Sequence, residues 1–248
     1  MQNLQNDDLM DATVLASFYS FPPNNYGYCG NPTFRSALSS YLSDNSQANI
    51  NRLKEEITKF PAHYAYLDFI AKENDLDPFS DEVVRAFWTG NSLLQNISPL
   101  AMKNFIKNGL FKGRQSKRVD SLISNLPYGS VPHHSFNSLY IHFVTDRLER
   151  SIENFSSCCI SWGKVLNISE KQVSLEHTTI SYENGLVLKT GLSNVDLERN
   201  GVKFVSNLSN GDILSVHWGM AVEKLNVENL YLLKKWTQIN IDAINNSK

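Results

Sequence analysis

The spacing of apolar residues changes near residue 150, and this change limits the possible folds more than any other feature of the chain. Before that point, apolar side chains recur at helical spacing, as in Val83, Val84 and Phe87. After Cys158, short segments alternate apolar and polar residues in the way of strands with one buried face. The sequence therefore predicts an α+β protein, with a mostly helical domain over residues 1–155 and a smaller β-rich domain over residues 156–248.

Proline after a capping residue marks the expected helix starts in the first part. Asn31-Pro32, Asp77-Pro78 and Ser98-Pro99 each place a side chain that can cap a helix before a proline that suits the first turn. Residues 135–144 are instead rich in β-prone side chains. We expect a strand there, followed by a short helix over residues 145–155.

The second part reads as a series of short strands closed by one helix. Asn184-Gly185 is the dipeptide that a tight hairpin of type I′ prefers. Closely spaced strands of this kind indicate a small OB-like β-barrel, and Asn226 is placed to cap a C-terminal helix that lies across it. The expected strands cover residues 164–168, 172–177, 179–182, 186–190, 202–205 and 213–216.

Two segments of this second part carry side chains suited to metal chemistry. The first begins at Cys158 and reads Cys-Cys-Ile-Ser-Trp-Gly-Lys-Val, and the second, Gly-Asp-Ile-Leu-Ser-Val-His-Trp-Gly-Met-Ala, contains His217. A thiolate and a neutral imidazole are suitable donors for iron, and a thiolate tolerates π-acid ligands on the same metal. Cys159 would point to the opposite face of a strand, so we interpret it as a packing residue.

Together these segments resemble the two signatures of the HypC/HupF family of hydrogenase-maturation chaperones, over roughly residues 156–245. The order of the segments and the spacing from Cys158 to Gly163 match that family. The resemblance implies that Cys158 holds an iron carrying CO and cyanide, with His217 nearby. It also implies a partner, either a hydrogenase large subunit or another maturation protein. Two features depart from the family: Cys158 lies inside the chain, and Trp162 replaces a proline.

The first part contains further candidate metal ligands. His133 and His134 follow a Pro-Tyr-Gly turn, and Cys29 lies in a segment, residues 21–30, that combines aromatic residues, prolines and glycines. We interpret both segments as loops, and we expect them to face Cys158 and His217 across a cleft if the two parts share a function. The alternatives are histidines with satisfied hydrogen bonds and an apolar loop that packs on the other domain.

Composition excludes some classes of function. A formal net charge of −2 gives no electrostatic reason to expect a nucleic acid or an anionic membrane as partner. Three cysteines, two of them adjacent, cannot form a disulfide framework, which favours a reducing compartment. The polar N-terminus and the lack of a long apolar run predict a cytoplasmic protein.

Three functions are compatible with these observations. The first is a metallocentre maturation factor that binds iron, alone or as a unit with CO and cyanide. The second is an iron-dependent enzyme that makes or modifies a diatomic ligand at an interdomain cleft. The third is an interaction module without a metal. Whether the protein is an enzyme stays open at this point, and so do its client and its oligomeric state.

Overall fold

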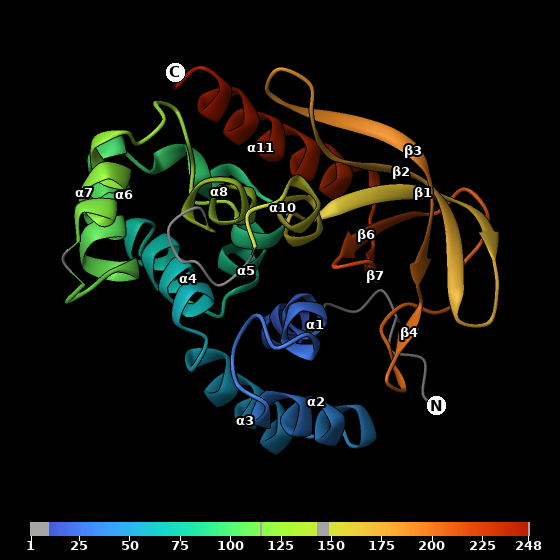
Figure 1. Ribbon diagram of the computed structural model, residues 1–248. Coiled ribbons are helices and arrows are strands. Elements are labelled where there is room, and N and C mark those ends of the chain that lie inside the picture. Colours follow the sequence, from blue (N-terminus) through green and yellow to red (C-terminus); the bar gives the residue numbers. More distant parts are fainter. Residues whose placement is uncertain (1–9, 115, 143–148, 248) are drawn as a thin grey trace.

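Helices form the first part of the molecule, and a β-sheet followed by one long helix forms the second (Figure 1). The computed structural model describes residues 10–114, 116–142 and 149–247. This arrangement confirms the α+β class with a helical N-terminal part. The helical elements before the sheet are α1 (Ala12–Asn25), α2 (Thr33–Ser43), α3 (Gln47–Thr58), α4 (Pro61–Glu73), α5 (Asp81–Trp88), η1 (Ser92–Asn96), α6 (Pro99–Phe105), η2 (Ile106–Leu110), α7 (Lys117–Ser124), α8 (His134–Phe136), η3 (Asn137–Ile141) and α10 (Ile152–Cys158).

Two of the expected helix starts are confirmed and one is wrong. α2 begins directly after Asn31-Pro32, and α6 begins at Pro99 with the Ser98 side chain accepting a hydrogen bond from a backbone N–H. α5, however, begins at Asp81 and is capped by Ser80. Asp77-Pro78 forms a turn before it, because the Asp77 carboxylate and carbonyl accept hydrogen bonds from the backbone N–H groups of the next residues.

The strand expected over residues 135–144 is a helical segment, as far as the described residues reach. α8 and η3 replace it, and η3 is a π-helix. The segment is buried between α10 and α11 (Val227–Asn245), so packing from several sides overrides the β-propensity of its side chains. Of the helix expected over residues 145–155, the part up to residue 148 lies outside the described residues; α10 begins at Ile152 and continues to Cys158.

The loop expected over residues 21–30 is helical in its first half. α1 continues to Asn25 and contains Pro22 and Pro23 in its last turn, and the loop begins only at Tyr26. A proline has no backbone N–H, so each of these residues leaves one carbonyl of the preceding turn without its helical partner. α1 is buried over almost its whole length, which compensates for the lost hydrogen bonds.

The sheet has five strands in the order β1-β2-β3-β7-β6, and β6 pairs back with β1 so that the sheet closes on itself. The strand expected before Asn184-Gly185 is longer than expected, because residues 172–182 form one strand. Two strands were not expected: β7 pairs with β6 across a tight turn, and the two-residue β4 pairs with β5. The strands are β1 (Ser161–Ile168), β2 (Gln172–Tyr182), β3 (Leu186–Asp196), β6 (Ile213–His217) and β7 (Met220–Lys224), with β4 (Glu198–Arg199) and β5 (Val202–Lys203) as a separate pair.

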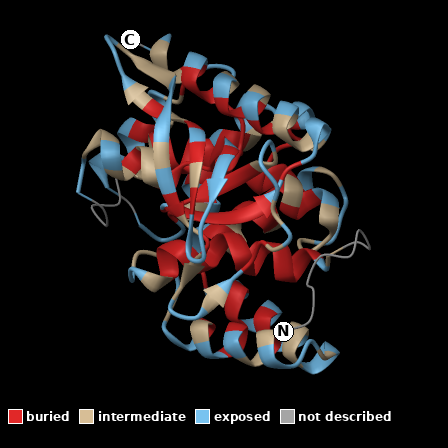
Figure 2. Ribbon diagram, turned by 90° about the vertical axis from the view of Figure 1, so that its right-hand side faces the viewer, coloured by how far each residue is buried: buried red, intermediate tan, exposed pale blue. Residues whose placement is uncertain are grey.

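The helical part and the sheet share one hydrophobic core. Its largest cluster joins Phe18 of α1, Phe87 of α5, Trp162 of β1, Met220 of β7 and Trp236 of α11. Figure 2 shows this buried layer running through the middle of the molecule. The expected division between residues 155 and 156 falls inside α10. Among the described helices, none is both long and apolar enough to cross a membrane.

Candidate metal site

Three metal-capable side chains from different elements converge in the interior. His134 at the start of α8, Cys158 at the end of α10 and His217 at the end of β6 are buried, and their donor atoms lie within 4.8 Å of one another. Ligands of one tetrahedral metal ion lie roughly 3.5 Å apart, given metal–sulfur and metal–nitrogen bonds of about 2.3 and 2.0 Å. A contraction of about 1 Å would therefore let the three side chains bind one ion.

His217 has one ring nitrogen held by the backbone and the other available. Its Nδ1 lies 2.7 Å from the Tyr19 carbonyl, which can only accept a hydrogen bond, so Nδ1 carries the proton. Tyr19 lies four residues before Pro23, and because proline has no N–H, this carbonyl is released from the helix. The Nε2 of His217 is buried without a hydrogen-bond partner. A lone pair oriented in this way is what a metal-ligating histidine presents.

A strained hairpin turn places His217 beside Cys158. Trp218 and Gly219 connect β6 to β7 with positive φ angles of 50° and 70°, the conformation of a type I′ turn. A bulky aromatic residue rarely adopts such a φ, and strain of this kind concentrates at functional sites. The Trp218 backbone N–H donates to the Ser157 carbonyl at 2.9 Å, which ties the turn to α10. The Trp218 ring packs against Cys158.

His134 is oriented by Ser138 and by aromatic rings. The Ser138 hydroxyl lies 3.1 Å from the His134 carbonyl, 3.1 Å from the Cys158 carbonyl and 3.4 Å from His134 Nδ1. Its single proton goes to a carbonyl in this arrangement, so Nδ1 of His134 can only donate to it. The His134 ring stacks on Trp88 at 4.5 Å and meets the His217 ring edge-on at 5.1 Å. Ser138 therefore links two of the three donors.

Burial determines the protonation of all three donors. It lowers the pKa of His217 to about 4 and that of His134 well below its usual value, so both imidazoles are neutral at neutral pH. Burial also raises the pKa of the Cys158 thiol well above its usual value. In the absence of a metal, Cys158 is therefore protonated, and a metal that binds to its sulfur would displace this proton.

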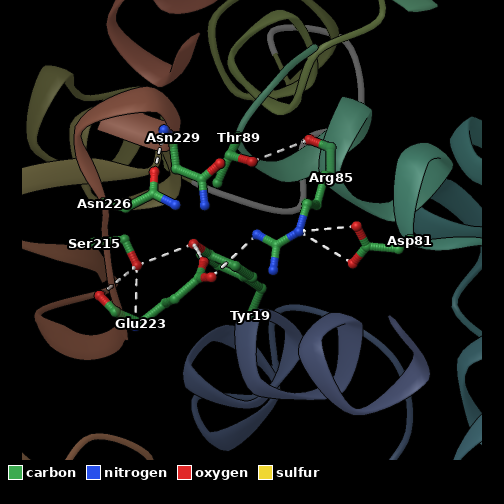
Figure 3. A network of polar contacts seen from close by, with 8 residues as sticks. All are labelled: Tyr19, Asp81, Arg85, Thr89, Ser215, Glu223, Asn226 and Asn229. Atoms are coloured by element: carbon green, nitrogen blue, oxygen red, sulfur yellow. Dashed lines mark hydrogen bonds and ion pairs between the residues drawn. The ribbon is translucent and has the colours of Figure 1, made fainter. Parts of the chain in front are cut away.

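A buried polar network fixes Tyr19, the residue that orients His217 (Figure 3). The Tyr19 hydroxyl donates to Glu223 at 2.9 Å and lies 3.0 Å from the Ser215 hydroxyl. Arg85 forms an ion pair with Glu223 at 3.1 Å and a second one with Asp81 at 3.0 Å. The network joins α1, α5, β6 and β7, so the sheet and the helices hold Tyr19 from both sides.

The other side chains expected at the site have different positions. His133 is the N-cap of α8: its Nδ1 accepts from the backbone N–H of Ser135, and it is not among the three clustered donors. Cys29 is half-buried, and it is close enough to Cys158 to raise the pKa of that thiol. Cys159 packs with Phe155, Ile180 and Ile241, as expected of a packing residue, but it follows the last residue of α10 and does not lie in a strand as expected.

Sequence analysis missed two histidines near the site. His63 of α4 lies 3.1 Å from the Ser20 hydroxyl through Nδ1, its Nε2 is buried without a partner, and its ring contacts Trp88. His142, directly after η3, has its Nε2 3.5 Å from the Cys158 sulfur. The signal for His142 was the spacing of His134, Ser138 and His142 at intervals of four residues. This helical spacing was missed because the sequence predicts a strand over residues 135–144.

An open cavity of about 410 Å³ lies beside the cluster. Tyr28 and Trp218, which pack on Cys158, form part of its wall, together with Ser157. Arg199 also borders the cavity, where it pairs with Asp196 at 2.8 Å, donates to the Trp218 carbonyl at 2.9 Å and lies over the Tyr26 ring at 4.9 Å. The cavity therefore brings solvent close to Cys158, and the aromatic rings separate the two.

The model of a family of unknown function, DUF6390, matches residues 10–248 of this chain. Because the match covers both the helical part and the sheet, the chain belongs to that family. No curated protein and no solved structure matches the chain.

Proposed function

We propose that this member of the DUF6390 family is a metallocentre maturation factor that binds iron for the assembly of a nickel–iron hydrogenase. The observation that carries the proposal is the convergence of His134, Cys158 and His217, with a free lone pair on His217 Nε2. The resemblance of two segments to the HypC/HupF family supports iron over other metals. The position of His134, a candidate ligand from the helical part, within 4.8 Å of the pair that the resemblance implies supports a third donor.

The chemistry of this donor set suits such a cargo. One thiolate and two neutral imidazoles leave further coordination positions on a six-coordinate iron, and a thiolate is compatible with CO and cyanide on the same metal. Trp88, Trp218 and Tyr28 surround the donors with aromatic rings, which would shield the metal from water. A reducing, cytoplasmic location belongs to the proposal, because it would keep the Cys158 thiol reduced.

Fold and partner also belong to the proposal. We interpret the closed five-stranded sheet with α11 as an OB-like barrel of the HypC/HupF type. The partner would be a hydrogenase large subunit or another maturation protein. The cavity beside Cys158 provides an opening on the surface close to the metal, where such a partner could receive it.

An iron-dependent enzyme is the second candidate, and His63 favours it. Its ring and the ring of His217 both contact Trp88, and its Nε2 is buried without a hydrogen-bond partner, yet it is not one of the three clustered donors. A neutral imidazole in that position could accept a hydrogen bond from a ligand on the metal, in a reaction that makes or modifies a diatomic ligand. An interaction module without a metal is the third candidate.

Metal analysis of protein isolated anaerobically from its host distinguishes these functions. Iron with infrared bands of bound CO and cyanide supports the maturation factor. Iron that turns over a substrate supports the enzyme. Wild-type protein without any metal contradicts both of these functions and supports the interaction module.

Adjacent cysteines provide a matched pair of variants for this experiment. Cys158→Ala is expected to lose the metal with the fold intact, because it removes the thiolate donor. Cys159→Ala is expected to retain the metal and to lower the free energy of unfolding by only about 1 kcal/mol, since it removes a small packing side chain. Equal iron content in Cys158→Ala and wild type would contradict the assignment of Cys158 as a metal ligand.

A further inference from the structure

We infer that His142 is a fourth protein ligand of the metal, an inference that rests on the metal site proposed above. The His142 Nε2 lies 3.5 Å from the Cys158 sulfur. A nitrogen and a sulfur bound to one tetrahedral metal lie roughly 3.5 Å apart, given bonds of about 2.0 and 2.3 Å. His142 and Cys158 therefore already have the separation of two ligands on one ion.

The π-helix η3 explains how one segment presents two histidines to the same site. His134 lies just before η3 and His142 just after it, and the His142 backbone N–H donates to the Asn137 carbonyl across the π turn. A π turn includes one more residue than an α turn, so it changes the direction of the side chains that follow. Single π turns of this kind occur frequently at functional sites.

Electrostatic effects on the other two donors agree with the same placement. Alongside burial, which is the main cause, His142 lowers the pKa of both His134 and His217. It is not among the donors that lie within 4.8 Å of one another, so it would join them by a rotation of its ring. The His142 side chain is half-buried, whereas the other three donors are buried.

Asn137 holds His142 in the metal-free arrangement. The Asn137 amide nitrogen lies 3.2 Å from His142 Nε2, and an amide N–H donates to a lone pair at that distance. Binding a metal would replace this hydrogen bond by a metal–nitrogen bond. His142 is then the exchangeable ligand of the four, because it alone is partly exposed and has an alternative partner ready.

Cobalt(II) is a direct probe of this ligand set. The full-length protein, reduced and kept anaerobic, is titrated with cobalt(II), and X-ray absorption at the cobalt edge counts nitrogen and sulfur neighbours. The wild type is expected to show one sulfur and three imidazole nitrogens. His142→Ala is expected to show one imidazole fewer and a Kd for cobalt raised at least about tenfold.

His177→Ala is the matched control, because His177 is a buried histidine that is not among the clustered donors, and its nitrogens lie 2.8 and 2.7 Å from the hydroxyls of Ser161 and Ser193. It should keep the wild-type spectrum and Kd. If His142→Ala does not fold, His142→Gln, which keeps most of the side-chain volume, replaces it. A His142 variant with the wild-type cobalt spectrum and the wild-type Kd for cobalt would overturn the inference that His142 is a ligand, but it would leave the other three donors in place. Wild-type protein that binds no cobalt would overturn the proposed metal site as well.

Discussion

One hydrogen bond determines which ring nitrogen of His217 can bind a metal. A bond of 2.7 Å from Nδ1 to the Tyr19 carbonyl selects the tautomer and leaves Nε2 as the available donor. The sequence nominated His217 and Cys158, because their segments carry recognisable residue types at recognisable spacing. It gave no indication of the tautomer, because the partner carbonyl lies 198 residues away along the chain.

Buried histidines also make the stability of the fold depend on pH. Burial lowers the pKa of His177 from 6.5 to about 4, so between these values the unfolded chain binds a proton that the folded chain does not. The contribution to the free energy of unfolding is therefore present above pH 6.5 and decreases as the pH falls, by up to about 1.4 kcal/mol per pH unit.

His177→Gln removes this titration and is expected to flatten the decrease in stability between about pH 6.5 and 4. Denaturant unfolding of wild type and variant at several pH values measures the two slopes. Because His63, His133 and His217 also have lowered pKa values, a residual slope should remain in the variant. Identical slopes in both proteins would contradict the prediction.

At the scale of elements, Pro23 in α1 leaves the Tyr19 carbonyl free to orient His217 in the proposed metal site. Pro23→Ala introduces an N–H that competes with His217 for the Tyr19 carbonyl, since that carbonyl lies one helical turn earlier. We expect a metal affinity weakened about tenfold, the usual effect of losing a partner that orients a ligand. The helix itself should be as stable as before or more so, because alanine restores a helical hydrogen bond.

Pro22→Ala is the control for this prediction. It introduces the same N–H one residue earlier, toward the Phe18 carbonyl, which holds none of the three clustered donors. Isothermal titration of all three proteins with cobalt(II) compares their affinities. If both proline variants bind cobalt as tightly as wild type, Pro23 is not needed to keep the Tyr19 carbonyl available to His217, and the prediction is wrong.

The segment α8 to η3 shows the limit of reading elements from local pattern. Its side chains have the composition of a strand, and only the packing of α10 and α11 around it makes a helix. The helices with clear amphipathic periodicity were located from the sequence, and so were most strands of the sheet. A segment buried on several sides has no periodicity to reveal its type, and the candidate ligand that lies beyond it, His142, was missed for this reason.

At the scale of the whole molecule, the helical part and the sheet depend on each other. The Arg85–Glu223 ion pair and the shared core cross between them. A fragment of residues 156–248 would expose Trp162, Met220 and Trp236, which are buried in that core. We expect this fragment to lack a cooperative thermal transition and to bind a hydrophobic dye, whereas the full chain melts in one transition. A cooperative melt of the fragment alone would show that the parts are independent.

The sequence by itself determined the α+β class, the place where helices give way to strands and two of the three clustered donors, because these follow from local spacing and from short segments. It also nominated His134, without a reason to prefer it to His133. Only the tertiary structure decided between them: His133 caps α8, whereas His134 lies beside Cys158 and His217. The packing of α1, α8 and α10 against the hairpin of β6 and β7 sets these distances, and contacts between residues far apart in the chain leave no pattern in a single sequence.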